Sequence, residues 1–352
     1  MKGHNVYISG RKVGDDSPPL IIAEMSGNHN QSLRRALEIV EAAASSGVHA
    51  LKIQTYTPNL LTLDVKERDF LIQDKKSLWY GQSLYDLYGK AFTPWDWHEK
   101  IIKRSVELGM LCFSTPVDES SVDFLENLQV PCYKVGSFEL THIPLLKRIA
   151  ACGKPMILST GMGTVREIAE AVDIVRSTGN HDLILMKCTS TYPADPKHSN
   201  IATIPHMRAL FNCEVGLSDH TLGIGVAVAS IAFGASVIEK HFTLHRADGG
   251  VDSAFSIEPH EMKMLVEESV RAWQSIGETV FGPSEAEHKS LAFRRSLYVA
   301  RDISSGERFT KENVRIIRPG HGLAPKFFEI VIGRVANRDL KKGTPISWDV
   351  IS

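Results

Sequence analysis

Positively charged and hydroxyl side chains follow short apolar segments along the first two thirds of the sequence. Lys52 and Lys134 each lie within or directly after such a segment. Hydroxyl groups stand at the ends of other segments, at Thr115, Ser137, Ser159 and Ser218. Lysine supplies a point charge and hydroxyls supply hydrogen-bond donors, so together these residues could hold a phosphate group. The alternative is that each lysine forms an ordinary ion pair.

Two histidines, His220 and His241, follow consecutive apolar segments near the end of this region. Neutral imidazoles suit Mn²⁺, Zn²⁺ or Fe²⁺. The two stand without a cysteine or a close carboxylate, which favours an open, water-rich metal site. Glu24 could bind a water at such a site or act as a base. The competing interpretation is a pair of hydrogen-bonded core histidines.

The segments that carry these side chains alternate with amphipathic stretches, which is typical of β/α repeats on a parallel sheet. Helical spacing is clearest over 33–45, 97–108, 165–177, 225–233 and 259–276. Eight repeats in roughly 260 residues predict a (β/α)8 TIM barrel, whose catalytic groups lie at the carboxyl ends of the strands. A doubly wound open sheet is the alternative. The eight expected strands are 20–23, 50–54, 110–113, 132–135, 155–158, 183–187, 214–217 and 236–239.

The remaining segments divide the chain into a barrel and a tail. The first 20 residues predict a β-hairpin cap, so we expect a catalytic barrel domain over 1–280. The long loop 57–93 carries several aromatic residues and is expected to cover the barrel mouth. A polar stretch at 281–290 predicts a linker, and short β-like pieces at 291–352 predict a small separate domain.

Composition excludes several classes of partner. The 352 residues contain 40 Lys and Arg against 41 Asp and Glu, a net charge of −1. Bulk electrostatic binding to nucleic acid or to an anionic membrane is therefore not expected. The sequence shows no secretory signal and no apolar run of about 18 residues, so no membrane span is expected. Five scattered cysteines favour reduced thiols and a cytoplasmic location.

The ordered motifs closely resemble the sialic acid synthase family over essentially the whole chain. The tail segments Arg294-Arg295-Ser296-Leu297-Tyr298 and Arg318-Pro319-Gly320 look like the antifreeze-like (SAF) domain that ends these enzymes. The barrel motifs are Ile22-Ala23-Glu24 with Asn28-His29, Lys52-Ile53-Gln54, Phe113-Ser114-Thr115-Pro116, Tyr133-Lys134-Val135-Gly136-Ser137, Ser159-Thr160-Gly161-Met162, Gly216-Leu217-Ser218-Asp219-His220-Thr221 and Glu239-Lys240-His241-Phe242.

The resemblance implies a transferase that condenses phosphoenolpyruvate with an amino-sugar aldehyde, giving a nine-carbon α-keto acid and phosphate. It implies a divalent ion on His220 and His241, usually Mn²⁺, with Mg²⁺ or Co²⁺ as alternatives, and Glu24 beside the metal-bound water. It implies a homodimer in which Arg318 of one subunit's tail reaches the other subunit's sugar. The resemblance assigns the binding of phosphoenolpyruvate to Lys52, Thr115, Lys134, Ser137, Ser159, Ser190 and Ser218. It assigns the binding of the sugar to Gln54, Glu139, Tyr192, Asp252 and Arg318.

Within this family the chain looks most like the pseudaminic acid synthases. It departs from the sialic acid branch, which often has Asn at the position of Ser190. The branch motifs are 92–98, 187–193 and 251–256, and the implied sugar is 2,4-diacetamido-2,4,6-trideoxy-L-altrose. N-acetylneuraminate or legionaminate synthesis is the first alternative. A Schiff-base aldolase using Lys134 or Lys187, and a non-catalytic sugar-binding protein, are the others.

Overall fold

The computed structural model describes residues 5–352; residues 1–4, with which the predicted barrel domain begins, lie outside the described residues. In this part of the chain, eight parallel strands close into a barrel in the order β10-β3-β4-β5-β6-β7-β8-β9. The pairing of β10 with β3 closes the ring, so the TIM barrel is confirmed and the open sheet is wrong. The strands are β3 Leu20–Glu24, β4 Ala50–Thr55, β5 Leu111–Pro116, β6 Tyr133–Val135, β7 Met156–Ser159, β8 Leu183–Cys188, β9 Glu214–Asp219 and β10 Val237–His241.

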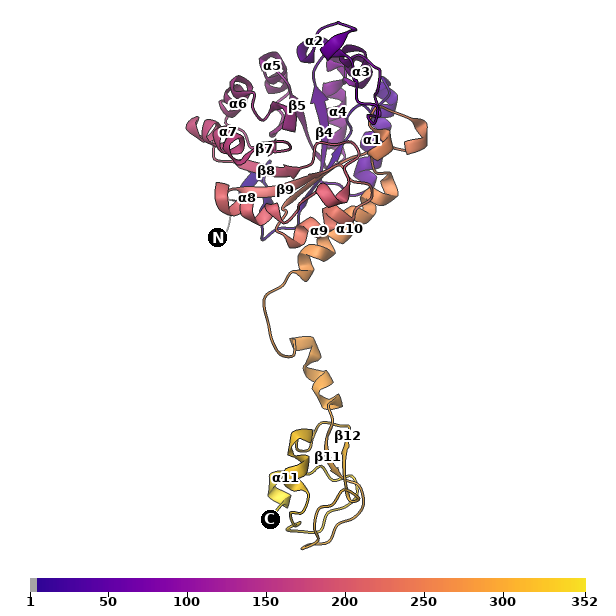
Figure 1. Cartoon of the computed structure of the whole chain (residues 1–352), viewed down its shortest axis with the longest axis vertical. Helices are drawn as coiled ribbons and strands as arrows, with labels where there is room; N and C mark the ends of the chain where they lie inside the picture. Colours follow the sequence, from indigo (N-terminus) through magenta and orange to yellow (C-terminus); the bar gives the residue numbers. More distant parts are fainter. Residues whose placement is uncertain (1–4) are drawn as a thin grey trace. The chain divides into compact units, whose positions relative to one another are not determined.

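Helices surround the barrel and cover the outer face of its strands (Figure 1). Local signals fix their ends: Ser32 caps α1, and Thr164 and Glu167 form a capping box at α7. Both helices coincide with the predicted ranges. The outer helices are α1 Leu33–Ser45, α4 Trp95–Glu107, α5 Glu119–Asn127, α6 Ile143–Ala150, α7 Val165–Ser177, α8 Thr203–Phe211, α9 Gly225–Ala232 and α10 Pro259–Ser275.

The N-terminal hairpin plugs one end of the barrel interior. Strands β1 (Val6–Ile8) and β2 (Arg11–Val13) pair antiparallel and bury Val6, Ile8 and Val13. These side chains pack against residues from the starts of the barrel strands, including Leu20 and Val237. A second, larger apolar layer lies between the strands and the outer helices. The interior is therefore dry and apolar at its amino-terminal end.

The loop between β4 and α4 contains three short helices, α2 Pro58–Leu61, η1 Arg68–Phe70 and α3 Leu84–Ala91. Trp79 anchors it over the barrel mouth by donating from Nε1 to the carbonyl oxygen of Val251 at 2.9 Å. The Trp79 ring also lies 6.0 Å from that of Tyr192. The loop thus forms one wall of the mouth, as expected. Shorter 3₁₀ helices near the mouth are η2 Ser137–Glu139, η3 Pro196–His198, η4 Arg246–Asp248 and η5 Ser253–Phe255.

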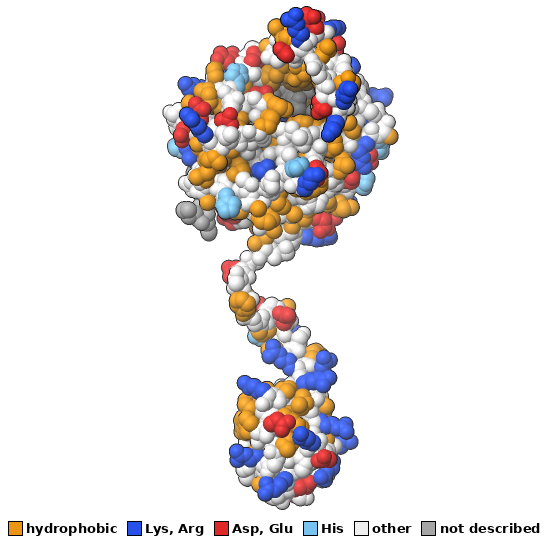
Figure 2. All heavy atoms as spheres, in the orientation of Figure 1, with side chains coloured by type: hydrophobic (Ala, Val, Ile, Leu, Met, Phe, Trp, Pro, Cys, Tyr) orange, Lys and Arg blue, Asp and Glu red, His pale blue; other side chains and the backbone are white. Residues whose placement is uncertain are grey.

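The chain divides into two compact units, Met1–Gly277 and Glu278–Ser352, here called the barrel unit and the tail unit. In the tail unit, β11 (Ser296–Val299) and β12 (Val314–Ile317) pair antiparallel over a small apolar core. Basic side chains are spread over the face of this unit seen in Figure 2. Its short helices are η6 Glu285–Phe293, η7 Pro325–Phe327, α11 Phe328–Val331 and η8 Trp348–Val350.

The predicted linker at 281–290 is partly helical, from Glu285 onward. Helix η6 begins after Ser284, whose side chain and that of Glu287 form a reciprocal capping box. The Ser-x-x-Glu spacing of such a box is a sequence signal for a helix start at this point of the linker. Over residues 5–352, none of the helices is long and apolar enough to cross a bilayer.

Candidate active site

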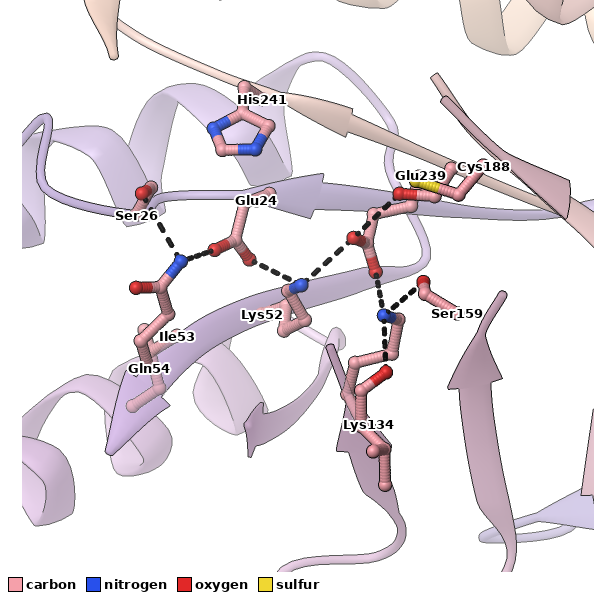
Figure 3. Close-up of polar contacts among 12 residues, drawn as sticks. Glu24, Ser26, Lys52, Ile53, Gln54, Lys134, Ser159, Cys188, Glu239 and His241 are labelled. Atoms are coloured by element: carbon pink, nitrogen blue, oxygen red, sulfur yellow. Dashed lines mark hydrogen bonds and ion pairs between the residues drawn. The ribbon is translucent and has the colours of Figure 1, made fainter. Parts of the chain in front are cut away.

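Closure of the barrel brings acidic and basic side chains from distant strands into contact at the carboxyl ends of the strands. Glu24 of β3 lies in register with Lys52 of β4 and with His241 of β10. The Lys52 Nζ lies 2.8 Å from Glu239 Oε1 and 3.3 Å from Glu24 Oε2. Lys134 Nζ donates to Ser159 Oγ at 2.6 Å and lies 4.0 Å from Glu239 Oε2. Figure 3 shows this cluster of two lysines and two glutamates.

All four charged groups of this cluster are buried, and burial alone disfavours each charge. Burial raises the pKa of Glu24 to about 7, opposed by Lys52 and assisted by Glu239. Although burial opposes it, Lys134 and Lys52 hold the pKa of Glu239 well below its ordinary value. Burial lowers the pKa of Lys134 to about 8. The cluster therefore contains a fixed anion, Glu239, beside a carboxyl group that titrates near neutrality, Glu24.

The predicted phosphate-binding hydroxyls surround this cluster. Ser218 Oγ donates to Glu239 Oε1 at 3.3 Å, and Ser137 Oγ accepts from the Gly161 N–H at 3.1 Å. The Gly161 backbone also passes close to Ser190 Oγ, so Ser137 and Ser190 approach one another there. Within residues 5–352, the buried Thr115 Oγ1 has no hydrogen-bond partner. Ser159 and Ser218 thus contact the lysine–glutamate cluster directly, whereas Ser137 and Ser190 approach one another at Gly161.

The two predicted metal ligands are neighbours at the mouth, with ring centroids of His220 and His241 5.3 Å apart. The Nδ1 of His220 hydrogen-bonds the carbonyl oxygen of Thr189 at 2.9 Å, which leaves its Nε2 for another partner. The Nδ1 of His241 has no hydrogen-bond partner among the described residues, and it lies 3.7 Å from Asp252 Oδ2. Burial, together with the neighbouring His220, lowers the pKa of His241 and keeps the imidazole neutral.

This pair fits a divalent ion that keeps open coordination positions for water and substrate. A closed protein cage does not fit, because no group of three or more His, Cys, Asp or Glu side chains converges within residues 5–352. The orphaned ring nitrogen of His241 and the hydrogen-bonded ring nitrogen of His220 are both features of imidazoles arranged for metal ligation.

The predicted sugar-binding residues of the barrel unit line the same mouth. Gln54 Nε2 donates to Glu24 Oε1 at 2.8 Å. Tyr192 lies against His220, with ring centroids 4.4 Å apart, and 5.4 Å from Phe255. Burial raises the pKa of Glu139, and the charge of Lys134 opposes that shift. Arg318 is exposed in the tail unit and is described there by itself.

Two residues that contact this site were missed as site residues. Glu239 holds both lysines, and Ser26 hydrogen-bonds both Gln54 and Asp252. A signal for Glu239 existed, since it stands two residues before His241 and so shares the inward face of the same strand. No sequence signal pointed to Ser26, because its contact with Asp252 spans 226 positions.

Lys187 does not join the cluster. Its Nζ donates to the carbonyl oxygen of the neighbouring Cys188 at 2.9 Å. Its neighbours on the strand, Met186 and Cys188, are buried, and Lys187 alternates with them along β8. Of the two candidate Schiff-base lysines, only Lys134 lies in the site.

Comparison with known proteins identifies the family of this chain. The NeuB family matches residues 39–281, and the SAF domain matches residues 294–351. The chain belongs to the NeuB family. It is 42% identical to a pseudaminic acid synthase of Campylobacter jejuni over 328 residues, covering 93% of this chain and 95% of that protein. It is 39% identical to a pseudaminic acid synthase of Helicobacter pylori, covering 95% and 98% of the two chains.

Other similar proteins have lower sequence identity. An N,N'-diacetyllegionaminic acid synthase of Campylobacter jejuni is 35% identical, covering 92% of this chain and 97% of that protein. Among solved structures, an N-acetylneuraminic acid synthetase from Leptospira borgpetersenii superposes with a TM-score of 0.74 at 28% identity, covering 83% and 96% of the two chains. The Bacillus subtilis spore coat polysaccharide biosynthesis protein SpsE gives 0.66 at 31% identity, covering 99% of each.

Proposed function

We propose that this protein is a pseudaminic acid synthase, condensing phosphoenolpyruvate with 2,4-diacetamido-2,4,6-trideoxy-L-altrose to a nine-carbon α-keto acid and phosphate. The observation that carries the proposal is the buried cluster of Lys52, Lys134, Glu24 and Glu239 beside two histidines at the barrel mouth. The names of relatives at 39–42% identity support this choice of sugar.

The lysines bind the anionic groups of phosphoenolpyruvate in this proposal. Lys134 stands beside Ser159, and Lys52 stands between two carboxylates, so an entering phosphate would meet charges already fixed in place. Charges held ready in a water-poor site stabilise the negative charge that builds up on the departing phosphate when its C–O bond breaks. Thr115, with its unpartnered buried hydroxyl, supplies a donor for the same ligand.

His220 and His241 would hold a divalent ion, for which we propose Mn²⁺ first and Mg²⁺ or Co²⁺ as alternatives. Such an ion, when bound, polarises a carbonyl oxygen such as that of the open-chain sugar aldehyde. The aromatic rings of Tyr192 and Phe255 flank both imidazoles and limit access of water from that side.

Glu24 is the proposed general base. In the reaction, C3 of phosphoenolpyruvate bonds to the aldehyde carbon, and water adds at C2. The tetrahedral carbon then expels phosphate by cleavage of its C–O bond. With a pKa of about 7, the Glu24 carboxylate can accept the proton of the attacking water near neutral pH. Gln54 holds one carboxylate oxygen of Glu24 and so orients the other toward Lys52.

Synthesis of N,N'-diacetyllegionaminic acid is the second candidate, supported by a relative of that name at 35% identity. The observation that favours the first candidate is the higher identity to the pseudaminic acid synthases, 42% and 39% against 35%. The apolar wall formed by Phe255 and Tyr192 beside His220 favours either of these 6-deoxy sugars over one that carries a 6-hydroxyl. Phe255 is 2% exposed and Tyr192 is partly buried. Both rings offer an apolar surface to a 6-deoxy sugar, and such contacts are worth roughly 1 kcal/mol per methyl-sized group.

We also propose a homodimer in which Arg318 of one subunit completes the sugar site of the other. Opposite charges of the two units support it: residues 278–352 contain 13 Lys and Arg against 9 Asp and Glu, within a chain of net charge −1. The barrel unit is therefore acidic and the tail unit basic, which favours their association. An exposed arginine fork suits the carbonyl and hydroxyl oxygens of an acetamido sugar.

A substrate panel tests the proposed reaction. Purified protein with Mn²⁺ is given phosphoenolpyruvate and each candidate sugar in turn, and keto acid and phosphate are both measured. We expect the altrose derivative to have the highest kcat/KM. Highest turnover with a legionaminate or neuraminate precursor would replace the first candidate. Borohydride trapping of a covalent adduct on Lys134 would indicate a Schiff-base aldolase instead.

Subunit mixing tests the dimer. Lys134→Ala and Arg318→Ala proteins, each inactive, are mixed after verified subunit exchange. If sites are shared, half of the dimers are mixed and each regains one intact site of two, so about a quarter of the wild-type activity returns. No recovery after exchange would mean that each tail serves its own barrel or that Arg318 is not a site residue.

A further inference from the structure

A single hydroxyl group, that of Ser26, connects the residues on both sides of the site. Ser26 follows β3 by two residues and is 3% exposed. Its Oγ donates to Asp252 Oδ2, in the loop after β10, and accepts from Gln54 Nε2 at 3.3 Å. Gln54 in turn donates to Glu24. One small side chain therefore joins three elements of the mouth. Figure 3 shows Ser26 beside Gln54 and Gln54 beside Glu24.

The backbone at Ser26 is unusual for a serine. Its φ is 49°, in the left-handed region where a β-carbon costs free energy that glycine avoids. The next residue, Gly27, has no room for a β-carbon, because one built there would lie 2.9 Å from the Cα of Ala91. The turn is therefore fixed from outside by α3. In this turn, Ser26 occupies a position whose left-handed backbone favours glycine. Backbone strain of this kind is found at functional sites.

The hydroxyl uses both its donor and an acceptor position. A serine Oγ offers one donor and two acceptor positions, and here the donor and one acceptor are used on side chains that we assigned to the sugar. Asp252 is 8% exposed and also accepts a hydrogen bond from the backbone N–H of Gly27. The carboxylate of Asp252 is thus held by two consecutive residues of the β3–α1 loop.

We propose that Ser26 is a positioning residue for the sugar, which fixes Asp252 and Gln54 relative to each other and to Glu24. This inference rests on the proposed function, since it takes both side chains as sugar contacts. It places the consequence of losing Ser26 on the sugar and not on phosphoenolpyruvate. Among the described residues, Lys52 hydrogen-bonds Glu239 and Lys134 hydrogen-bonds Ser159, and neither lysine hydrogen-bonds Ser26.

Two substitutions separate the effect of losing the Ser26 hydroxyl from the effect of its left-handed backbone conformation. Ser26→Ala removes the hydroxyl and keeps the β-carbon in its left-handed conformation, whereas Ser26→Gly removes both. We expect both variants to raise KM for the sugar and to lower kcat/KM roughly tenfold to a hundredfold, the usual range for one lost charge-assisted hydrogen bond. KM for phosphoenolpyruvate should stay within about twofold. Ser26→Gly should melt at a higher temperature than Ser26→Ala, because glycine relieves the strain.

Ser105→Ala is the matched control. Ser105 is fully buried, and its hydroxyl donates to the carbonyl oxygen of Ile101 within α4 and lies beside the Cys112 thiol. This variant should change the melting temperature without changing the KM of either substrate. A double-mutant cycle with Asp252→Asn adds a second measurement. If Ser26 acts through Asp252, the two effects on the sugar KM should combine to much less than their product.

The outcomes distinguish this inference from the proposed function. If the wild-type protein forms keto acid with a candidate sugar and Ser26→Ala leaves the sugar KM unchanged, Ser26 has only a structural role and the inference is wrong. Equal increases in both KM values would also overturn it. If the wild type releases no phosphate with any sugar of the panel, the proposed function fails. That result would precede any measurement on Ser26.

Discussion

The two ends of the barrel interior are built from opposite kinds of side chain. At the amino-terminal end, Ile22, Phe113 and Ile184 pack with the hairpin into a fully buried apolar layer. Two residues further along the same strands, Glu24 and Thr115 face the mouth. Burying each apolar side chain contributes roughly 1.5–3 kcal/mol to stability, whereas each buried charge costs free energy unless it is paired. One end therefore stabilises the fold, and the other end carries the chemistry.

Loss of the metal site should have the largest effect at the mouth. We expect chelation to abolish turnover. His220→Ala or His241→Ala should weaken Mn²⁺ binding on the order of 10²-fold or more, because each removes one of two protein ligands. Titration calorimetry with Mn²⁺ measures the affinity directly. His206→Ala, at an exposed position on α8, is the control and should bind the ion normally. Normal Mn²⁺ affinity in both site variants would refute the assignment.

Glu24→Gln should separate activity from stability. The variant keeps the shape of the side chain and its place beside Gln54, but it cannot accept a proton. We expect kcat to fall roughly 10²- to 10⁴-fold, the usual contribution of a positioned base. The wild-type rate should rise with pH through about 7, the pKa of Glu24, and this limb should disappear in the variant. Because the carboxyl is already partly neutral at pH 7, the melting temperature should change little; a large drop would indicate a structural role.

The sequence predicted the barrel because its strands and helices repeat with a period that chance does not sustain over eight units. It left the open sheet as an alternative because the ring is closed by the pairing of β10 with β3, and that pairing joins residues 217 positions apart, such as His241 and Glu24. For the same reason Ser26 was missed, since a left-handed backbone and a contact with Asp252 are properties of the folded chain. The residues at the strand ends were predictable because the short apolar segments marked where each strand ends.

Ile184→Ala tests the other end of the barrel. Ile184 is fully buried in the apolar layer with the hairpin, on β8. Its truncation should lower the free energy of unfolding by about 3 kcal/mol, through lost burial and the cavity left behind. Denaturant unfolding measures this loss. Well below the melting temperature, kcat and both KM values should equal those of the wild type. A loss of activity without a loss of stability would mean that the two ends are coupled.

A third kind of buried polar group, the neutral histidine, lies in the wall between β4 and the helix α4. Its effect on stability should become measurable at acidic pH. His98 Nε2 lies 2.8 Å from Thr55 Oγ1, and His29 stacks edge-on against Trp97. Unlike the charges at the mouth, these imidazoles are held neutral: burial lowers the pKa of each to about 4. The unfolded chain, with a histidine pKa near 6.5, therefore binds more protons between pH 6.5 and pH 4.

The free energy of unfolding therefore falls as the pH is lowered, because protons bind more strongly to the unfolded chain. The stabilisation is complete above about pH 6.5 and is lost as the pH falls toward 4, by about 2 kcal/mol per histidine at pH 5. In His98→Gln, whose amide can still hydrogen-bond Thr55, the fall in unfolding free energy between pH 7 and pH 5 should be smaller by that amount. Denaturant unfolding at the two pH values measures it. An equal fall in wild type and variant would mean that His98 is protonated in the folded protein, and that the wall tolerates charge as the mouth does.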